Sequence, residues 1–175
     1  GDPTKAGIGT LRAAELYGRM GPAVEMSGGA AANSMVGAAS FGSRAAYIGK
    51  VRDDELGAIF AHDIRAAGVR FDVPPAPDGP ETARSHILVT PDAHRTMSTY
   101  LGAAVELGPE DVDTDLVAAS AALYLEGYLW DKPRAKDSFR VAMRAAHAAG
   151  RRVSLTLSDW FCVERPLDEF RALVD

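Results

Sequence analysis

Residues 27–42 read Ser-Gly-Gly-Ala-Ala-Ala-Asn-Ser-Met-Val-Gly-Ala-Ala-Ser-Phe-Gly. Gly28 and Gly29 precede an alanine-rich stretch that favours helix, and Gly42 lies where that helix would end. Because glycine lacks Cβ, backbone at the pair can approach a ligand closely. The free N–H groups of the first helical turn and the amide of Asn33 would then suit a small molecule with many hydroxyl groups. A tight turn without a ligand is the alternative interpretation.

The sequence that follows strengthens the ligand interpretation. Residues 44–51 (RAAYIGKV) predict a buried strand, and residues 52–57 (RDDELG) open another helix. This combination resembles the first signature region of the ribokinase/PfkB-like family of carbohydrate and nucleoside kinases. In that family a Gly-Gly pair, and an Asn four residues after the second Gly, hold substrate hydroxyls. The resemblance extends in weaker form to the end of the chain and is greatest to adenosine kinase-like members.

Predicted helices and strands alternate along the chain, which indicates a parallel sheet covered by helices. Residues before 11 look irregular, and the proline-rich stretch 71–80 is a predicted loop. Asp53 or Asp54 is expected to cap one helix rather than to form a catalytic pair. The predicted helices cover 11–20, 30–41, 54–67, 113–119 and 134–149, with a last one beginning near Pro166, and the predicted strands cover 45–51, 82–90, 95–101, 121–125 and 152–157.

The resemblance refines this α/β class to a ribokinase-like three-layer sandwich with a central, mostly parallel sheet. Residues 1–175 would form part of one such domain. A small β-hairpin at about 82–101 would be inserted as a lid over the site, where it would exclude water as a competing acceptor.

Two candidate groups follow predicted strands, where ligands of open α/β sheets bind. Glu126 follows residues 121–125, and the pair Ser158-Asp159 follows residues 152–157. A solvated strand end is the alternative for Glu126, but sugar kinases of the family often place a Glu there to bind a substrate hydroxyl. Asp159 is the weaker candidate. The Leu-Thr-Leu-Ser of 155–158 resembles the Leu-x-Leu-Ser strand end of adenosine kinase-like relatives, and it supports the alignment more than the chemistry.

Arg95 follows the predicted turn of the hairpin. A guanidinium group can hold phosphate oxygens and stabilise charge while a phosphoryl group moves. Adenosine kinase-like proteins carry an Arg in this hairpin that can reach the active site, so the resemblance implies that role for Arg95. Without the resemblance, a surface charge beside a turn would be the preferred interpretation.

The resemblance implies transfer of the ATP γ-phosphoryl group, with Mg²⁺, to a primary hydroxyl of a nucleoside or sugar. The first choice is the 5′-hydroxyl of adenosine, which gives AMP. Gly28, Gly29 and Asn33 would orient the ribose and Glu126 would assist. Ribokinase-type or fructokinase-type sugar phosphorylation is the alternative.

Several family features are missing from the 175 residues. Relatives continue with an Asn-x-x-Glu segment associated with Mg²⁺ and phosphate, and with a Gly-Ala-Gly-Asp motif whose Asp is the catalytic base. Neither motif occurs here, and the first strand, with its substrate-binding Asp, is expected to be absent or disrupted. No P-loop motif is present either. The chain is therefore interpreted as a piece of a complete kinase without its ATP-binding part, or else as a short protein that binds substrate without catalysis.

Composition sets limits on the partners. The net charge of −5 and the scattered Lys and Arg residues argue against nucleic-acid binding. No apolar run suits a membrane span, and the four histidines lack metal-ligand spacing. The single cysteine, Cys162, excludes an intrachain disulfide, suits the cytoplasm and is expected to be a small core residue. The expected partner is a small nucleoside or sugar. Family members are monomers or dimerise through the lid, and an exposed apolar face on the hairpin would favour the dimer.

Overall fold

The computed structural model describes residues 5–7, 9–160, 162 and 168–169. The helices are α1 (Thr10–Arg19), α2 (Ala30–Ser40), α3 (Glu55–Ala66), α4 (Thr114–Ala119) and α5 (Pro133–Ala148), with 3-10 turns at Gly102–Glu106, Pro109–Asp111 and Gly127–Leu129. The strands are β1 (Lys5–Gly7), β2 (Ala45–Ala46), β3 (Val69–Arg70), β4 (Arg84–Val89), β5 (Arg95–Tyr100), β6 (Ala122–Glu126) and β7 (Arg152–Thr156).

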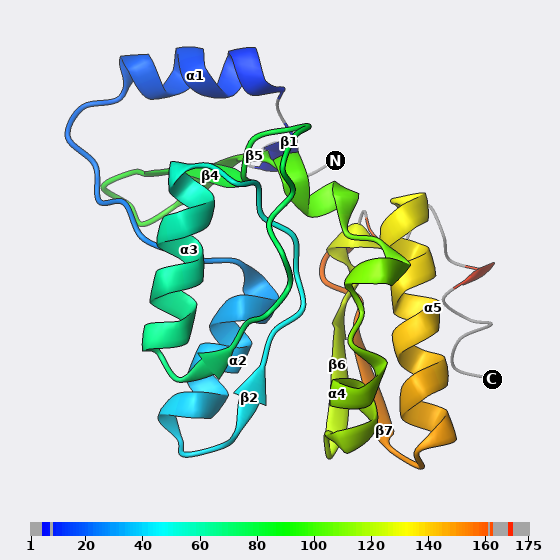
Figure 1. Cartoon of the computed structure of the whole chain (residues 1–175). Coiled ribbons are helices and arrows are strands. Elements are labelled where there is room, and N and C mark those ends of the chain that lie inside the picture. The colour runs from blue at the N-terminus through cyan, green and yellow to red at the C-terminus, as the bar shows by residue number, and fades with distance from the viewer. Residues whose placement is uncertain (1–4, 8, 161, 163–167, 170–175) are drawn as a thin grey trace.

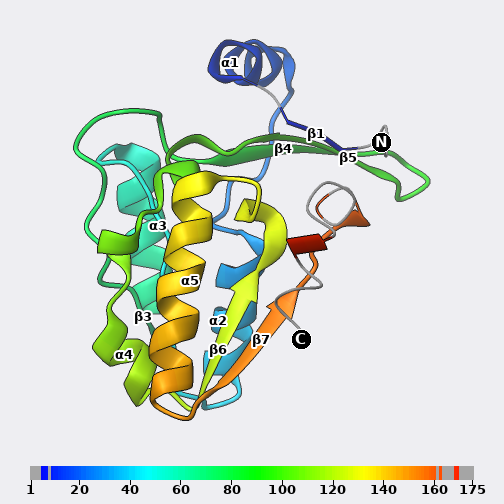
Figure 2. The same ribbon diagram turned by 90° about the vertical axis from the view of Figure 1, so that its right-hand side faces the viewer.

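A parallel pair of strands, β6 and β7, lies between helices. Its register runs from Ala122 opposite Arg152 to Glu126 opposite Thr156. Helix α5 covers one face of this pair and α2 lies on the other, as Figures 1 and 2 show from two directions. Strand pairs β1–β5 and β2–β3 are also parallel, and β4–β5 is antiparallel. The predicted α/β class, with mostly parallel pairing and helices on both faces, is confirmed.

The strands differ from the sequence-based expectation in three places. The described strands form three small sheets, β1-β5-β4, β2-β3 and β6-β7, rather than one continuous ladder. The strand predicted over 45–51 forms only a two-residue ladder, followed by a bridge from Arg52 to Ala76. The first residues, expected to be irregular, contain β1, which pairs with β5. Pairing with a distant strand, rather than the local propensity of Lys-Ala-Gly, accounts for β1. The start of the last predicted helix, near Pro166, lies outside the described residues.

An aromatic cluster holds α3 against the strands β2 and β3. The Phe71 side chain is 1% exposed and its ring lies 5.8 Å from Tyr47 and 5.5 Å from Phe60, centroid to centroid. A second cluster, of Leu125, Trp130 and Phe139, joins α5 to the β6–β7 pair. Burial of these large side chains holds the helices against the strands, and this packing sets where the strands end.

The hairpin predicted over 82–101 is confirmed as β4 and β5, paired from Arg84 opposite Tyr100 to Val89 opposite Arg95. In Figure 1 the hairpin and β1 lie above β6 and β7, and helix α1 lies above the hairpin and contacts it. The function of this hairpin as a lid stays a prediction.

The base of the hairpin is tied to the N-terminus of α3. Asp54 caps α3 as predicted, since its carboxylate accepts from the Gly57 N–H at 2.8 Å. The same carboxylate accepts from the Thr82 N–H at 2.9 Å and from the Thr82 hydroxyl at 2.6 Å. Thr82 Oγ1 in turn accepts from the Arg52 N–H at 3.0 Å. One carboxylate therefore serves both as a helix cap and as an anchor for β4.

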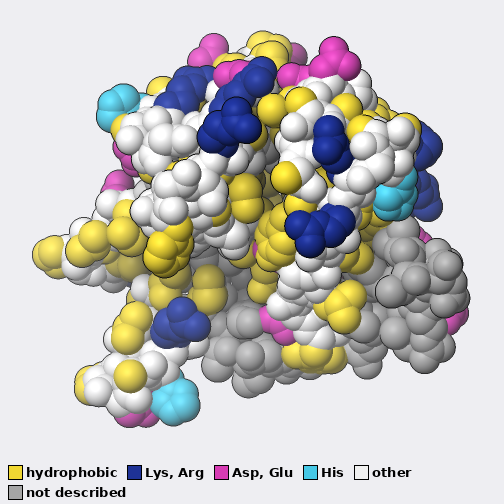
Figure 3. Space-filling view, turned by 90° about the horizontal axis from the view of Figure 1, so that it is seen from below, with side chains coloured by type: hydrophobic (Ala, Val, Ile, Leu, Met, Phe, Trp, Pro, Cys, Tyr) yellow, Lys and Arg dark blue, Asp and Glu magenta, His cyan; other side chains and the backbone are white. Residues whose placement is uncertain are grey.

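The surface carries dispersed charges and a number of exposed hydrophobic side chains. Figure 3 shows Lys and Arg side chains spread over the lower face, separated by other side chains. Phe41, at the C-terminal end of α2, is 92% exposed. Within the part of the chain that the structure describes, none of the helices has the length and apolar character needed to span a membrane.

Candidate functional site

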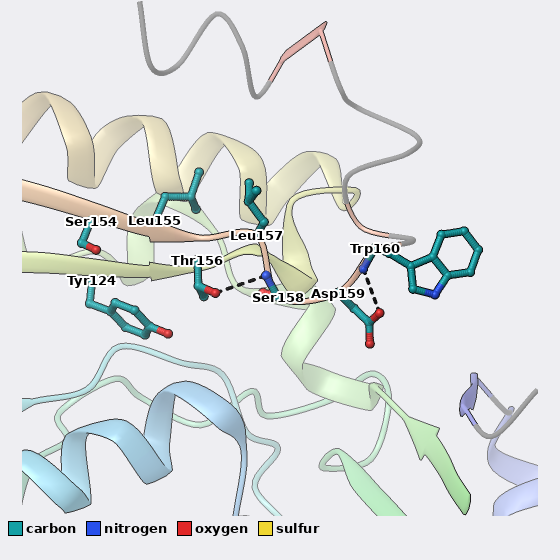
Figure 4. A pocket seen from close by; sticks show the side chains of 8 residues that line it. All are labelled: Tyr124, Ser154, Leu155, Thr156, Leu157, Ser158, Asp159 and Trp160. Carbon is teal, nitrogen blue, oxygen red and sulfur yellow. Dashed lines mark hydrogen bonds between the residues drawn. The ribbon is translucent and has the colours of Figure 1, made fainter. Parts of the chain in front are cut away.

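The carboxyl ends of β6 and β7 form an open polar pocket on the side of α2. Its volume is about 570 Å³, and it is lined by Tyr124 and residues 154–160. Figure 4 shows Tyr124 and Thr156 directed toward α2, whereas Leu155 and Leu157 point to the opposite face. This alternation is the period of two of a strand. On the opposite face, Leu155 packs against the cluster of Leu125, Trp130 and Phe139, whereas Leu157 is 48% exposed.

Glu126 ends β6 next to this pocket, where it contacts Tyr124 and Ser158 of the pocket lining, and it is half-buried. Its Oε1 accepts a hydrogen bond from the hydroxyl of Ser158, and its Oε2 lies 3.4 Å from the Tyr124 hydroxyl. Burial, together with the negative charge of Glu126, raises the pKa of the Tyr47 phenol above its ordinary value. Glu126 is therefore a partly exposed carboxylate with two neighbouring hydroxyl groups, and its binding role stays a prediction.

The Gly-Gly turn begins α2. Gly29 has φ 113° and ψ 136°, a backbone conformation that other residues rarely adopt, and its carbonyl accepts from the Asn33 N–H at 2.8 Å. A Cβ added to Gly28 would meet no atom within 4 Å. The fold itself thus explains glycine at position 29, while the space beside Gly28 stays open for a ligand. The turn is held to α3 by a 2.6 Å hydrogen bond from Ser27 to Asp63.

The structure brings the Gly-Gly turn and Glu126 to the same end of the molecule. Helix α2 packs against β6, and its N-terminus lies at the end where β6 and β7 terminate (Figures 1 and 2). Asn33, in the first turns of α2, is exposed. Helix N–H groups, an amide and a carboxylate can together bind a ligand that carries several hydroxyl groups.

Arg95 is not brought to this site in the structure. It is the first residue of β5, is exposed and pairs with Val89 next to the hairpin turn. The tip of the hairpin stands out from the rest of the chain in Figure 2. A role for Arg95 at the reacting phosphate stays a prediction, and it requires the hairpin to close.

Two other residues that the sequence analysis singled out have local roles. The carboxylate of Asp159 accepts from the Trp160 N–H at 2.8 Å, and Asp159 lines the pocket. Cys162 is buried, as predicted. Among the described residues, no group of three or more His, Cys, Asp or Glu side chains is placed to hold a metal ion.

Close approach of two backbones requires glycine directly after Glu126. The change Gly127→Ala is expected to lower the free energy of unfolding by about 1–3 kcal/mol. The added Cβ would lie 2.6 Å from the carbonyl oxygen of Thr156, and backbone cannot move aside as a flexible side chain can. Urea denaturation measures the loss, and Gly28→Ala serves as the control because its Cβ would meet nothing. Equal losses in the two variants would contradict the prediction.

Residues 11–175 match the family model described as pfkB family carbohydrate kinase. The chain belongs to this family. Among solved structures, the pfkB chain is 60% identical to an adenosine kinase from Sinorhizobium meliloti, with a TM-score of 0.92 over 97% of this chain and 52% of that one. A probable sugar kinase from Rhizobium etli CFN 42 is 54% identical, with a TM-score of 0.92 over 98% of this chain and 52% of that one.

A curated pfkB relative is named for a different substrate. Fructokinase-2 of Solanum habrochaites is 25% identical over 154 residues, which are 85% of this chain and 47% of the relative. The chain therefore spans about half the length of the relatives it matches. These similarities confirm the ribokinase-like fold expected from residues 27–57.

Proposed function

We propose that the protein containing this sequence phosphorylates a hydroxyl group of a nucleoside, with the 5′-hydroxyl of adenosine as the first choice, and that this chain supplies the acceptor site. Membership of the pfkB family and 60% identity to an adenosine kinase support the proposal. The observation that carries it is the position of Glu126 at the end of β6, at the same end of the molecule as the Gly-Gly start of α2 (Figures 1 and 2).

Each residue of the proposed site has a separate task. Backbone at Gly28 and Gly29 allows the ribose to approach, and the amide of Asn33 both donates to and accepts from ribose hydroxyls. Glu126 accepts a hydrogen bond from a hydroxyl of the acceptor. Phosphoryl transfer depends mainly on positioning and charge stabilisation, so an acceptor held at three points is already prepared for the reaction.

The family implies ATP and Mg²⁺, and the phosphoryl donor would be ATP. The described residues contain no acidic cluster that fits Mg²⁺, so no step through the metal is assigned to them. Arg95 would stabilise the transferred group once the hairpin has closed, and closure would exclude water as an acceptor.

Phosphorylation of a free sugar is the second candidate. It is supported by similarity to proteins named fructokinases, which match at about one quarter identity. The same glycines, amide and carboxylate would serve, because they interact with hydroxyl groups that nucleosides and sugars share.

The hairpin offers a surface for a homodimer. Ile87, Leu88 and Val89 of β4 are 44%, 43% and 64% exposed. We include a dimer formed through this apolar end of β4 in the proposal, since exposed apolar patches favour association.

Removal of the Asn33 amide tests the acceptor site. Asn33→Ala is expected to weaken adenosine binding at least about tenfold, because a paired polar ligand group loses its partner. Titration calorimetry of the 175-residue chain with adenosine, ribose and fructose measures this and identifies the preferred acceptor. Ser34→Ala is the matched control, since Ser34 is exposed on the same helix and bonds only its own backbone turn. Unchanged affinity in Asn33→Ala would refute the assignment, and tighter binding of fructose would favour the sugar kinase.

A further inference from the structure

Ser158 has an unusual backbone. Its φ is 65°, and within the described residues only Ala93 shares a positive φ without being glycine. Ala93 lies in the tight turn of the hairpin, where such a conformation is common. Ser158 instead follows the end of β7. A left-handed conformation persists at a non-glycine residue only where its surroundings enforce it, and such positions gather at functional sites.

The contacts of Ser158 explain how this conformation is held. Its N–H donates to Thr156 Oγ1 at 3.2 Å, and its hydroxyl donates to Oε1 of Glu126, 32 residues earlier. Glycine at position 127 permits the approach, because a Cβ there would lie 3.1 Å from Ser158 Oγ. The turn therefore ends β7 and places a hydroxyl group directly over the end of β6.

The geometry points to Ser158 as the positioning residue that fixes the Glu126 carboxylate for the acceptor hydroxyl. This inference rests on the proposed function. Ser158 occupies one carboxylate oxygen. Among the described residues, the other oxygen, Oε2, is contacted by the Tyr124 hydroxyl at 3.4 Å, and it can still accept from a ligand. A carboxylate accepts hydrogen bonds at both oxygens, so the first bond does not block the second.

Fixing Glu126 in advance lowers the entropy lost on binding. A glutamate side chain has several rotatable bonds, and ordering such a side chain during association opposes binding. With Ser158 in place, part of this ordering has already occurred in the free protein. Loss of the hydroxyl is expected to weaken acceptor binding by about three- to tenfold.

Two substitutions separate the hydroxyl from the backbone. Ser158→Gly removes the hydroxyl and accepts φ 65° without strain, whereas Ser158→Ala removes the hydroxyl and keeps the strain. Calorimetry with adenosine is expected to show the same three- to tenfold loss in both variants, although the glycine variant unfolds no more easily than the parent chain. A loss confined to Ser158→Ala would overturn the inference, since backbone strain alone would then explain it.

A double-mutant cycle tests whether Ser158 acts through Glu126. In a Glu126→Ala background, Ser158→Gly is expected to change adenosine affinity by less than about twofold, because the side chain to be fixed is gone. Independent, additive losses would overturn the inference.

A measurement without ligand distinguishes this inference from the proposed function. Carbon–carbon couplings in labelled protein report the rotamers of Glu126, which are expected to be single in the parent chain and averaged in Ser158→Gly. An unaltered Glu126 in Ser158→Gly would overturn the role of Ser158. If the Glu126 rotamers become averaged in Ser158→Gly but the parent chain binds neither nucleoside nor sugar, the role of Ser158 is confirmed and the proposed function is refuted.

Discussion

Replacement of Phe71 by alanine is expected to lower the free energy of unfolding by about 3–5 kcal/mol. The side chain is 1% exposed and contacts the rings of Tyr47 and Phe60, so truncation leaves a cavity that α3 and the short strands cannot fill. The Arg65 guanidinium also lies over the Phe71 ring, 5.6 Å from its centroid, while donating to the Phe71 carbonyl. Urea unfolding followed by circular dichroism measures the loss.

Two further variants calibrate this result. Phe71→Leu keeps most of the volume and is expected to lose less than half as much stability. Val24→Ala, at a side chain that is 88% exposed, is expected to stay within about 0.5 kcal/mol of the parent. A loss of unfolding free energy below about 1 kcal/mol for Phe71→Ala would show that this aromatic cluster is not the core that holds α3 against β2 and β3.

The change Asp54→Ala is expected to destabilise the chain by about 2–4 kcal/mol. It removes the cap of α3 and also leaves the N–H and hydroxyl of Thr82 without their acceptor, although Thr82 is only 5% exposed. Because Thr82 begins the hairpin, hydrogen exchange is expected to rise in β4 as well as in the first turn of α3. A rise confined to α3 would show that the carboxylate is only a helix cap. Asp53→Ala is the control at the neighbouring residue.

The same carboxylate predicts a pH dependence. Burial raises the pKa of Asp54, but the hydrogen bonds from Thr82 and Gly57 and the charge of Arg52 outweigh it, so the pKa lies below the ordinary value of 3.8. A lowered folded-state pKa contributes stability above the unfolded-state value and loses it as the pH falls through the folded-state value. The difference in stability between the parent chain and Asp54→Asn is therefore expected to shrink below about pH 4. A difference that stays constant from pH 7 to pH 3 would contradict this account.

The fold was predictable wherever local signals and burial agree. Asp54 lies before a helix with one apolar face and caps it as predicted, and the turn before Arg95 separates two strands that do pair. The position of Glu126 at the carboxyl end of β6 was predictable from its place after a buried run, since strand direction alone determines the edge of the sheet at which such a residue lies.

Contacts between distant residues were not predictable. Lys50 and Asp111 form a buried ion pair at 2.5 Å across 61 residues, and neither spacing nor composition indicates it. Ser158 was a candidate, with Asp159, only because it follows a predicted strand. Its contact with Glu126 was not predictable, because its left-handed backbone and its bond to Glu126 exist only after β6 and β7 have paired. A serine after a strand carries no local signal of such a role.

The backbone of Ser158 also has an evolutionary consequence. Glycine at this position would relieve a strain on the order of 1 kcal/mol, so selection for heat tolerance alone would favour it. Selection for acceptor binding would instead retain serine despite the strain. Two variant libraries, one selected for thermal stability and one for nucleoside binding, are therefore expected to differ first at position 158. The first would accumulate glycine there and the second would keep serine, before the two differ at the buried positions nearby.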